Sequence, residues 1–368
     1  MNFDFSDDQR TLRDHARRFL SEASDLHALR LAILSGTGYD QKLWQQITEQ
    51  GWQGVAIAEE HGGLGLGMLE LCVLTEELGR SLSAVPFFST VCLAAEVLKR
   101  CPSSISNPLL ERIVTGEVIV SVDLITPDQR WSQTSLHYDD ASLDGHSAPL
   151  AYGGNADFAI LPALQDGEPT LVLLDLTQDA VTLSKLLALD EVVPFVRVQA
   201  SSAKAALLCQ GQAAIDVMTR VVNQAAVLTA FEQLGGAEVA LETSRTYALE
   251  RYTFGRQIGS YQAVKHKLAD MAVKIELARS NAFYGAWALQ AGSDEELAVA
   301  AALSRVSAGE AFEFAAEECL HLHGGIGYTW EADCHFFYKR ARLLAVTLGN
   351  RTWIERLLSE GSLQTLHN

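Results

Sequence analysis

The sequence predicts a multi-domain α+β chain: an N-terminal all-helical domain over residues 1–116, a middle β-sandwich or barrel domain over 117–211 and a C-terminal four-helix bundle over 212–368. Two observations lead to this fold class. Apolar residues recur at helical spacing near both ends of the chain. Between them lie short β-like runs separated by Asp-Gly and Gly-Gly turn signals. Helices, then strands, then helices are therefore expected.

The N-terminal domain is expected to begin with a capped helix. Ser6 followed by Gln9 is a capping-box pattern, and apolar residues continue at helical spacing behind it. Further helices are expected over about 41–50 and 68–79, with the glycine-rich loop 59–67 between them. Residues 1–116 are thus predicted to contain no strand.

The middle and C-terminal domains follow from a change of pattern. The β-like runs are 118–124, 156–161 and 170–176. Long helices are then expected over 213–252, 261–291 and 295–321, with a last helix holding Trp353, Ile354, Leu357 and Leu358. Long helices joined by short connections are typical of a four-helix bundle.

The charge balance argues against two classes of partner. The chain has 368 residues, with 28 Lys and Arg against 46 Asp and Glu, a formal charge of −18. Such a surface repels nucleic acid and anionic lipid. No apolar run approaches the ~20 residues of a membrane span. We expect a cytoplasmic protein with no nucleic-acid partner and no membrane span.

Cysteine spacing predicts no metal site and no disulfide framework. There is no C-x-x-C pair and no zinc-like Cys/His cluster. Scattered buried thiols in a reducing cytosol are expected. The residues concerned are Cys72, Cys92, Cys101, Cys209, Cys319 and Cys334.

Common phosphate, metal and nucleophile motifs do not occur: the sequence has no G-x-x-x-x-G-K-[ST], strand-borne G-x-G-x-x-G, H-E-x-x-H or G-x-S-x-G. Four other strings stand out. They are EEHGGLGLGMLELCVLTEELGRSL at 59–82, LDGHSAPLAYGGNADFAILPA at 143–163, ALERYTFGRQIGSYQAVKHKLADM at 248–271 and LHLHGGIGYTWE at 320–331.

In this order the four strings resemble the acyl-CoA dehydrogenase family over nearly the whole chain. The string at 248–271 is the most specific and is similar to the family's FAD-binding helix pair, whereas 143–163 is a weaker match to its middle domain. The resemblance implies the acyl-CoA dehydrogenase fold, FAD as cofactor, an acyl-CoA substrate and an electron-transfer flavoprotein as electron acceptor.

The resemblance also assigns residues to FAD, reached from a neighbouring subunit. These are Arg251, Thr253, Phe254, Gln262, His321, Gly324 and Gly325. An arginine fork can hold a pyrophosphate and an aromatic can cover adenine or ribose, and their spacing of three places both on one helix-end face. Glycines permit close backbone approach. His321 replaces the family's glutamine and can still donate one hydrogen bond.

Plainer interpretations of the same residues stay open. Arg251 can instead pair with Glu250 or cap a helix. Gly324 and Gly325 can form only a helix C-cap and turn. His321 and His323 can be ordinary core or surface histidines.

The catalytic base of the family has no counterpart in this sequence. The family desaturates an acyl-CoA between Cα and Cβ, with a glutamate removing the α proton and the flavin accepting the β hydride. At the two positions that carry this glutamate the chain has Leu348, within Thr347-Leu348-Gly349-Asn350, and Ala225. Glu232 lies about 10.5 Å further along the helix than Ala225, beyond hydrogen-bond reach. The catalytic residue is therefore left unassigned.

The segments that contact the flavin ring also depart from the family pattern. Ile125-Thr126-Pro127-Asp128-Gln129-Arg130 stands in place of Thr-Glu-Pro-x-Ala-Gly-Ser-Asp. Leu150-Ala151-Tyr152-Gly153-Gly154 stands in place of Trp-Ile-Thr-Asn-Gly. The adenosine diphosphate end of the FAD site is kept while the isoalloxazine end is altered.

The resemblance therefore implies an FAD-dependent acyl-CoA dehydrogenase, and it leaves open whether this chain is active alone. More narrowly, the chain resembles the subunit without the glutamate in bacterial heterotetrameric enzymes of steroid side-chain degradation. A second dehydrogenase-like subunit would carry the glutamate; self-association to a dimer or tetramer is the other assembly. Two alternatives remain: a flavin monooxygenase or oxidase of the same fold, and a non-catalytic structural subunit. The acyl group cannot be read from the sequence.

Overall fold

The computed structural model describes residues 5–24, 26–126, 129–349 and 353–355. The chain divides into two compact units. The bundle unit comprises Met1–Leu26, Cys72–Ser83 and Ala226–Asn368, and the β unit comprises His27–Leu71 and Ala84–Ala225. Each unit is described by itself below.

Helices fill the first part of the chain, as predicted. Ser6 and Gln9 form the expected capping box at the start of the first helix. The helices predicted at 41–50 and 68–79 are confirmed. The helical elements are α1 Asp7–Ala23, α2 Leu26–Ser35, α3 Gln41–Glu49, α4 Met68–Arg80, a π-helix Phe88–Ala94, α5 Ala95–Arg100 and α6 Ser106–Val114.

The middle of the chain forms one mixed sheet. Its main path runs β1-β5-β2-β3-β8-β4, with β6 joining β5 and β8, and β7 pairing with β8. The strands are β1 Val120–Val122, β2 His137–Asp139, β3 Ser142–His146, β4 Leu150–Ala151, β5 Phe158–Gln165, β6 Glu168–Asp175, β7 Val181–Leu186 and β8 Phe195–Gln210. The three predicted β-like runs correspond to β1, β5 and β6 and are confirmed.

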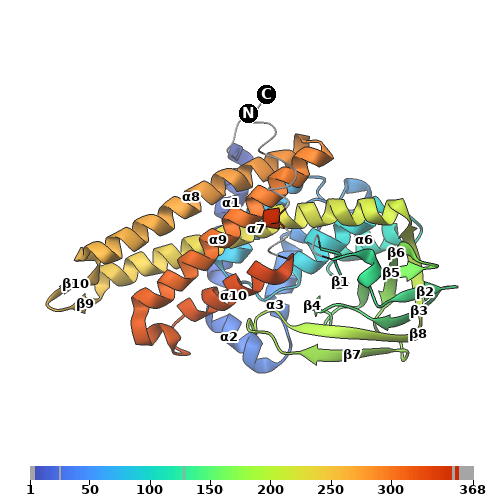
Figure 1. The fold of residues 1–368 in the computed structure, drawn as a ribbon, viewed down its shortest axis with the longest axis horizontal. Helices are drawn as coiled ribbons and strands as arrows, with labels where there is room; N and C mark the ends of the chain where they lie inside the picture. The colour runs from blue at the N-terminus through green and yellow to red at the C-terminus, as the bar shows by residue number, and fades with distance from the viewer. Residues whose placement is uncertain (1–4, 25, 127–128, 350–352, 356–368) are drawn as a thin grey trace. The chain divides into compact units, whose positions relative to one another are not determined.

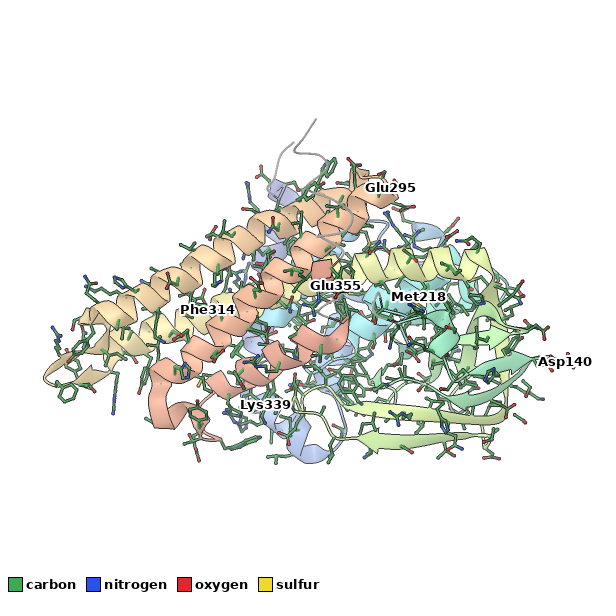
Figure 2. The ribbon with its side chains drawn as sticks, viewed as in Figure 1. Asp140, Met218, Glu295, Phe314, Lys339 and Glu355 are labelled. Atoms are coloured by element: carbon green, nitrogen blue, oxygen red, sulfur yellow. The ribbon has the colours of Figure 1, made fainter. Side chains whose placement is uncertain are left out.

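The sheet encloses an apolar core and is connected by tight turns. Leu143, Leu161 and Val172 are among its fully buried side chains. Asp140 and Ala141 have φ values of +42° and +64°, the combination of a type I′ turn, and join β2 to β3. Asp140 marks this hairpin tip in Figure 2.

Long helices return after the sheet (Figure 1). They are α7 Gln212–Glu250, α8 Gln262–Ala291, α9 Asp294–His323 and α10 Cys334–Thr347. A short hairpin, β9 Tyr252–Thr253 and β10 Arg256–Gln257, joins α7 to α8. The three long helices predicted from 213 to 321 are confirmed.

The last helix predicted around Trp353 and Ile354 agrees with the structure, in which residues 353–355 are helical; Leu357 and Leu358 lie outside the described residues. Helix α10 was not predicted, because basic residues interrupt its apolar pattern. Phe336 and Phe337 are buried, but so is Arg340, whose guanidinium pairs with Glu232 at 2.9 Å.

Helices α4 and α7 approach closely within the bundle unit. A Cβ on Gly79 would lie 2.2 Å from the carbonyl oxygen of Glu232, and one on Gly235 would lie 2.0 Å from that of Glu76. Only glycine permits such backbone contact. Ion pairs surround the crossing: Arg279 lies 2.9 Å from the buried Glu76, and Arg80 lies 2.6 Å from Glu238.

The cysteines are less scattered than predicted. The Sγ atoms of Cys101 and Cys209 lie 3.2 Å apart in the β unit. Cys319 and Cys334 are neighbours in the bundle unit, where each thiol shifts the pKa of the other. Residues far apart in the sequence cannot reveal such contacts through their spacing alone.

No helix within the described ranges is long and apolar enough to cross a bilayer.

Candidate functional site

The end of α7 turns sharply into the β9–β10 hairpin. The amide of Arg251 donates to the carbonyl of Tyr247 at 2.8 Å, which completes the last helical turn. Its own carbonyl accepts from the amide of Ile258 at 2.8 Å, because the chain doubles back. The prediction that Arg251 and Phe254 share a helix-end face was therefore wrong: the helix ends at Glu250, and Phe254 lies in the hairpin turn.

The hairpin turn presents an aromatic side chain to the outside of the chain. Phe254 and Gly255 have φ values of +50° and +80°. The Phe254 side chain is 94% exposed. A positive φ is unfavourable for a bulky residue. A phenyl ring left in water also lacks the stabilisation that burial of apolar surface provides. Figure 1 shows this hairpin at the far end of α7 and α8.

Two arginines flank the turn and differ in what they contact. The guanidinium of Arg256 lies 3.9 Å from the ring centroid of Tyr261, whose hydroxyl donates to the carbonyl of Thr253 at 3.1 Å. Arg251 is exposed and has no ion pair to Glu250 or to any other acid among the described residues. Its guanidinium is therefore available for a ligand. Gln262, the first residue of α8, is also exposed.

The glycine pair follows α9. Gly324 has φ +61° and ψ −141°, a conformation that favours glycine. A Cβ added to Gly324 or Gly325 would meet nothing within 4 Å. Gly324 thus ends the helix, as the plainer interpretation held. The space beside Gly325 is open, so a flat ligand could approach its backbone.

The two histidines before the glycines have different environments. The Nδ1 atom of His323 lies 2.7 Å from the carbonyl oxygen of Cys319, and its ring stacks on Tyr247 with centroids 4.1 Å apart. His323 is therefore a packing residue. His321 is exposed on the last turn of α9.

The stack of Tyr247 on His323 joins the two predicted segments. Arg251 follows Tyr247 by one helical turn, and Gly324 directly follows His323. The structure thus brings the predicted residues of 251–262 and 321–325 to the same end of the bundle unit. An unpaired guanidinium, an exposed aromatic ring and glycines beside open space suit a dinucleotide's pyrophosphate and adenosine.

The two residues predicted to stand in place of the family's glutamate are buried and apolar. Leu348 is fully buried, and its carbonyl accepts from the indole nitrogen of Trp353 at 2.8 Å. Ala225 is fully buried within α7. Glu232 is held in its ion pair with Arg340. Asn350, the last residue of the matching stretch, lies outside the described residues.

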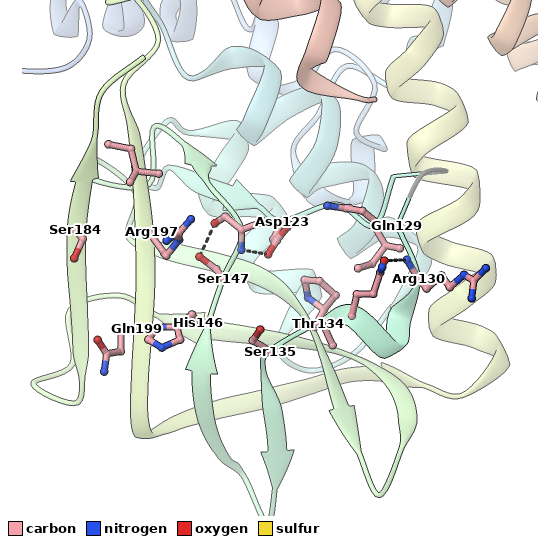
Figure 3. Close-up of a pocket in the computed structure, with 15 residues that line it drawn as sticks. Asp123, Gln129, Arg130, Thr134, Ser135, His146, Ser147, Ser184, Arg197 and Gln199 are labelled. Atoms are coloured by element: carbon pink, nitrogen blue, oxygen red, sulfur yellow. Dashed lines mark hydrogen bonds between the residues drawn. The ribbon is translucent and has the colours of Figure 1, made fainter. Parts of the chain in front are cut away.

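The β unit contains a polar cavity of about 580 Å³ (Figure 3). Asp123, at the end of β1, lies on its wall beside Ser147 and Arg197. One carboxylate oxygen of Asp123 accepts from the amide of Ala148 at 2.9 Å. Burial nevertheless raises the pKa of Asp123 to about 6. Sequence reasoning missed this residue; its one signal was an acid inside an apolar β run.

The segments expected at the flavin ring lack accessible hydroxyls in the structure. Ile125 lines the cavity where the family has a threonine. Tyr152, at the other threonine position, is buried, and its hydroxyl lies 3.5 Å from the carbonyl oxygen of Val192. Pro127 and Asp128 lie outside the described residues.

Two models of one known protein family match this chain, one before the sheet and one after it. The acyl-CoA dehydrogenase N-terminal domain matches residues 6–117, and the acyl-CoA dehydrogenase C-terminal domain matches residues 215–362. This chain belongs to the acyl-CoA dehydrogenase family. As an acyl-CoA dehydrogenase it is an oxidoreductase, and its cofactor is FAD.

Relatives of this acyl-CoA dehydrogenase include a protein of similar length. Acyl-CoA dehydrogenase IpdE2 of Mycobacterium tuberculosis is 31% identical over 357 residues, which cover 96% of this chain and 97% of IpdE2. A variant of the Tcur3481-Tcur3483 steroid ACAD superposes with a TM-score of 0.88 at 26% identity, covering 98% of this chain and 99% of that one. The ChsE4-ChsE5 complex from Mycobacterium tuberculosis has the same fold, with a TM-score of 0.88 at 24% identity over 98% of both chains.

Proposed function

We propose that this chain is the subunit of a heteromeric FAD-dependent acyl-CoA dehydrogenase that supplies cofactor contacts but no catalytic base. The observation that carries the proposal is that Leu348 and Ala225, the residues that the resemblance places at the family's two glutamate positions, are buried and apolar. Desaturation needs a group within hydrogen-bond reach of the α proton. A leucine and an alanine cannot accept it, so a second subunit would provide the carboxylate.

The cofactor contacts would come from the end of the bundle unit. Arg251 would hold the pyrophosphate of FAD in a bidentate contact, and Phe254 would cover its adenine or ribose. Gly325 would let the backbone approach, and Thr253 and Gln262 would add hydrogen bonds. His321, also exposed, would replace the family's glutamine, and Gly324 would hold the turn. FAD, when bound, supplies the hydride acceptor for desaturation.

The exposure of these residues favours a cofactor shared between subunits. Phe254 is 94% exposed and has a strained backbone. Burial of its ring against a ligand or another chain would therefore be favourable. We infer that the hairpin reaches FAD bound mainly to a neighbouring subunit. A heteromer is preferred over a homomer because a homomer would lack the base at every site.

The substrate class is proposed from relatives. IpdE2 is 31% identical to this chain, and the similar structure with 26% identity is described as a steroid ACAD of two named components. We propose a steroid side-chain acyl-CoA as substrate and an electron-transfer flavoprotein as electron acceptor. A cytoplasmic location stays a prediction.

The proposal is tested by co-expression with an acyl-CoA dehydrogenase subunit that carries the glutamate. We expect the two chains to elute together with FAD and to reduce an artificial electron acceptor when a steroid acyl-CoA is added. The chain alone should show at most a trace of this activity. Turnover by the chain alone at the rate of the pair would refute the proposal. Oxygen consumption with reduced flavin and no acyl-CoA would instead indicate an oxidase or monooxygenase.

Arg251 and Arg256 form a matched pair for testing the cofactor contact. Arg251→Ala should lower the FAD content of the purified complex by about tenfold or more, because a charge-assisted bidentate contact is lost. Arg256→Ala removes a similar charge from the same hairpin, but that guanidinium already rests on Tyr261. FAD content is measured by absorbance after heat release. Equal loss in both variants would mean that the charge of the hairpin matters and not Arg251 itself.

A further inference from the structure

Two thiols from distant parts of the sequence meet in the β unit. Cys101 follows the last residue of α5, and Cys209 lies near the end of β8, paired with Leu171 of β6. Their Sγ atoms are 3.2 Å apart. A disulfide needs about 2.05 Å, so the sulfur atoms must approach by only about 1 Å. Cys101 caps α5 and Cys209 lies within β8, so both backbones are fixed and the thiols are held together.

The surroundings of the pair favour reaction over inert packing. The hydrogen bond with Cys209 and the positive charge of Arg100 lower the pKa of Cys101, although burial acts in the opposite direction. The thiolate is the nucleophilic form of cysteine. Cys101 is only 5% exposed, but Cys209 is partly exposed, so a small oxidant can reach the pair from solvent.

We propose that Cys101 and Cys209 are a redox-active dithiol that hydrogen peroxide converts to an intramolecular disulfide. A thiolate of the pair attacks one peroxide oxygen, the O–O bond breaks, and a sulfenic acid and hydroxide form; the hydroxide takes up a proton to give water. The second thiol attacks the sulfenic sulfur, the S–O bond breaks, and water leaves as the S–S bond forms. In total two thiols and one peroxide give one disulfide and two waters.

The cross-link would tie the end of α5 to β8. All eight strands of the sheet start between Cys101 and Cys209, so the closed loop would contain nearly the whole sheet. Closing so long a loop restricts the unfolded chain. In a reducing cytosol the bond would form only under oxidative conditions and would be reversed by a dithiol reductant. This inference does not depend on the proposed role of the chain in a heteromer.

The test uses the full chain, reduced, desalted and titrated with hydrogen peroxide. Remaining thiols are alkylated with iodoacetamide, and the peptides are mapped by mass spectrometry. We expect the Cys101 and Cys209 peptides to become cross-linked, two hydrogen atoms lighter than their sum, and to separate again with dithiothreitol. Persistent alkylation of both residues, or sulfinic acid at Cys209 without a cross-link, would overturn the proposal.

Two variants distinguish the Cys101–Cys209 pair from the Cys319–Cys334 pair. Cys209→Ser should abolish the cross-link. Cys319→Ser removes a thiol of the buried pair in the bundle unit and should leave the Cys101–Cys209 cross-link unchanged. A disulfide between Cys319 and Cys334 that forms at lower peroxide doses would contradict the assignment. If a serine variant folds poorly, the peptide mapping of the peroxide-treated native chain still tests the proposal.

Discussion

Gly324 and Gly325 are adjacent but impose different requirements on the chain. Gly324 has a backbone conformation that favours glycine, whereas Gly325 has no positive φ, and a Cβ on either residue would meet nothing within 4 Å. A methyl group at Gly324 therefore strains the backbone, and one at Gly325 only occupies the open space beside it. Substitutions at the two positions therefore distinguish an effect on folding from an effect on ligand binding.

Alanine substitutions at the two glycines test this separation. Gly324→Ala should lower the free energy of unfolding by about 1–3 kcal/mol. Gly325→Ala should change it by no more than about 0.5 kcal/mol but should lower the FAD content of the complex. Denaturant unfolding and flavin absorbance measure the two effects. Unchanged FAD content in Gly325→Ala would mean that no ligand approaches this backbone.

Asp123 predicts a pH dependence of stability. Its pKa rises from 3.8 to about 6 on folding because it is buried. The folded state therefore binds more protons than the unfolded state between these values, and stability falls as the pH rises through that window. The difference corresponds to about 3 kcal/mol. Asp123→Asn keeps an acceptor for the Ala148 amide and should remove this loss.

The measurement is the free energy of unfolding of both proteins at pH 4 and pH 7. As the pH rises from 4 to 7, the free energy of unfolding of Asp123→Asn should increase by about 2–3 kcal/mol relative to that of the native chain. The reason is that only the native chain must ionise a buried carboxyl. Parallel pH profiles for the two proteins would mean that Asp123 is ionised without cost.

Single residues were predictable where their role is local. The capping box of Ser6 and Gln9 depends on a spacing of three and was read directly from the sequence. The contact of Cys101 with Cys209 depends on a 108-residue separation closed by the fold, and no local pattern encodes it. Phe254 is an intermediate case: the sequence assigned it to FAD, which stays a prediction, but its place in a hairpin turn was not foreseen.

At the scale of elements, the crossing of α4 and α7 depends on glycines. A Cβ on Gly235 would lie 2.0 Å from the carbonyl oxygen of Glu76, a backbone atom that cannot rotate away. Gly235→Ala should therefore destabilise the chain by about 2–4 kcal/mol despite the better helix propensity of alanine. Val239→Ala, one turn later and only half-buried, should cost about 1 kcal/mol or less.

Denaturant unfolding of the two variants gives the comparison. Equal, small effects would show that the two helices can separate without loss, and that the close approach contributes little to the stability of the bundle unit.

Elements were predictable where one pattern ran without interruption. The helices at 213–252, 261–291 and 295–321 matched α7, α8 and α9 because their apolar stripes are long. Helix α10 was missed because Arg340 is buried through an ion pair with a residue of α7, and a buried arginine looks exposed in the sequence. The π form of the helix Phe88–Ala94 could not be predicted, because its residues are almost all buried and leave no periodic stripe.

At the scale of the whole molecule, the sequence predicted the family because four strings occur in one order, and the comparisons confirm it. The site was only partly predictable. The strings identified residues at the end of the bundle unit, but the stack of Tyr247 on His323 that brings them together needed the structure. The proposed role of the chain within an enzyme rests on two residues, Leu348 and Ala225, that offer no carboxylate.

The most direct test of that role is flavin reduction under anaerobic conditions. The chain alone, supplied with FAD, is mixed with excess steroid acyl-CoA, and bleaching of the flavin is followed in a stopped-flow instrument beside the complex with a glutamate-bearing subunit. We expect bleaching by the complex and none by the single chain on the same timescale. Bleaching by the single chain at the rate of the complex would show that it carries its own base, and the proposed role would be wrong.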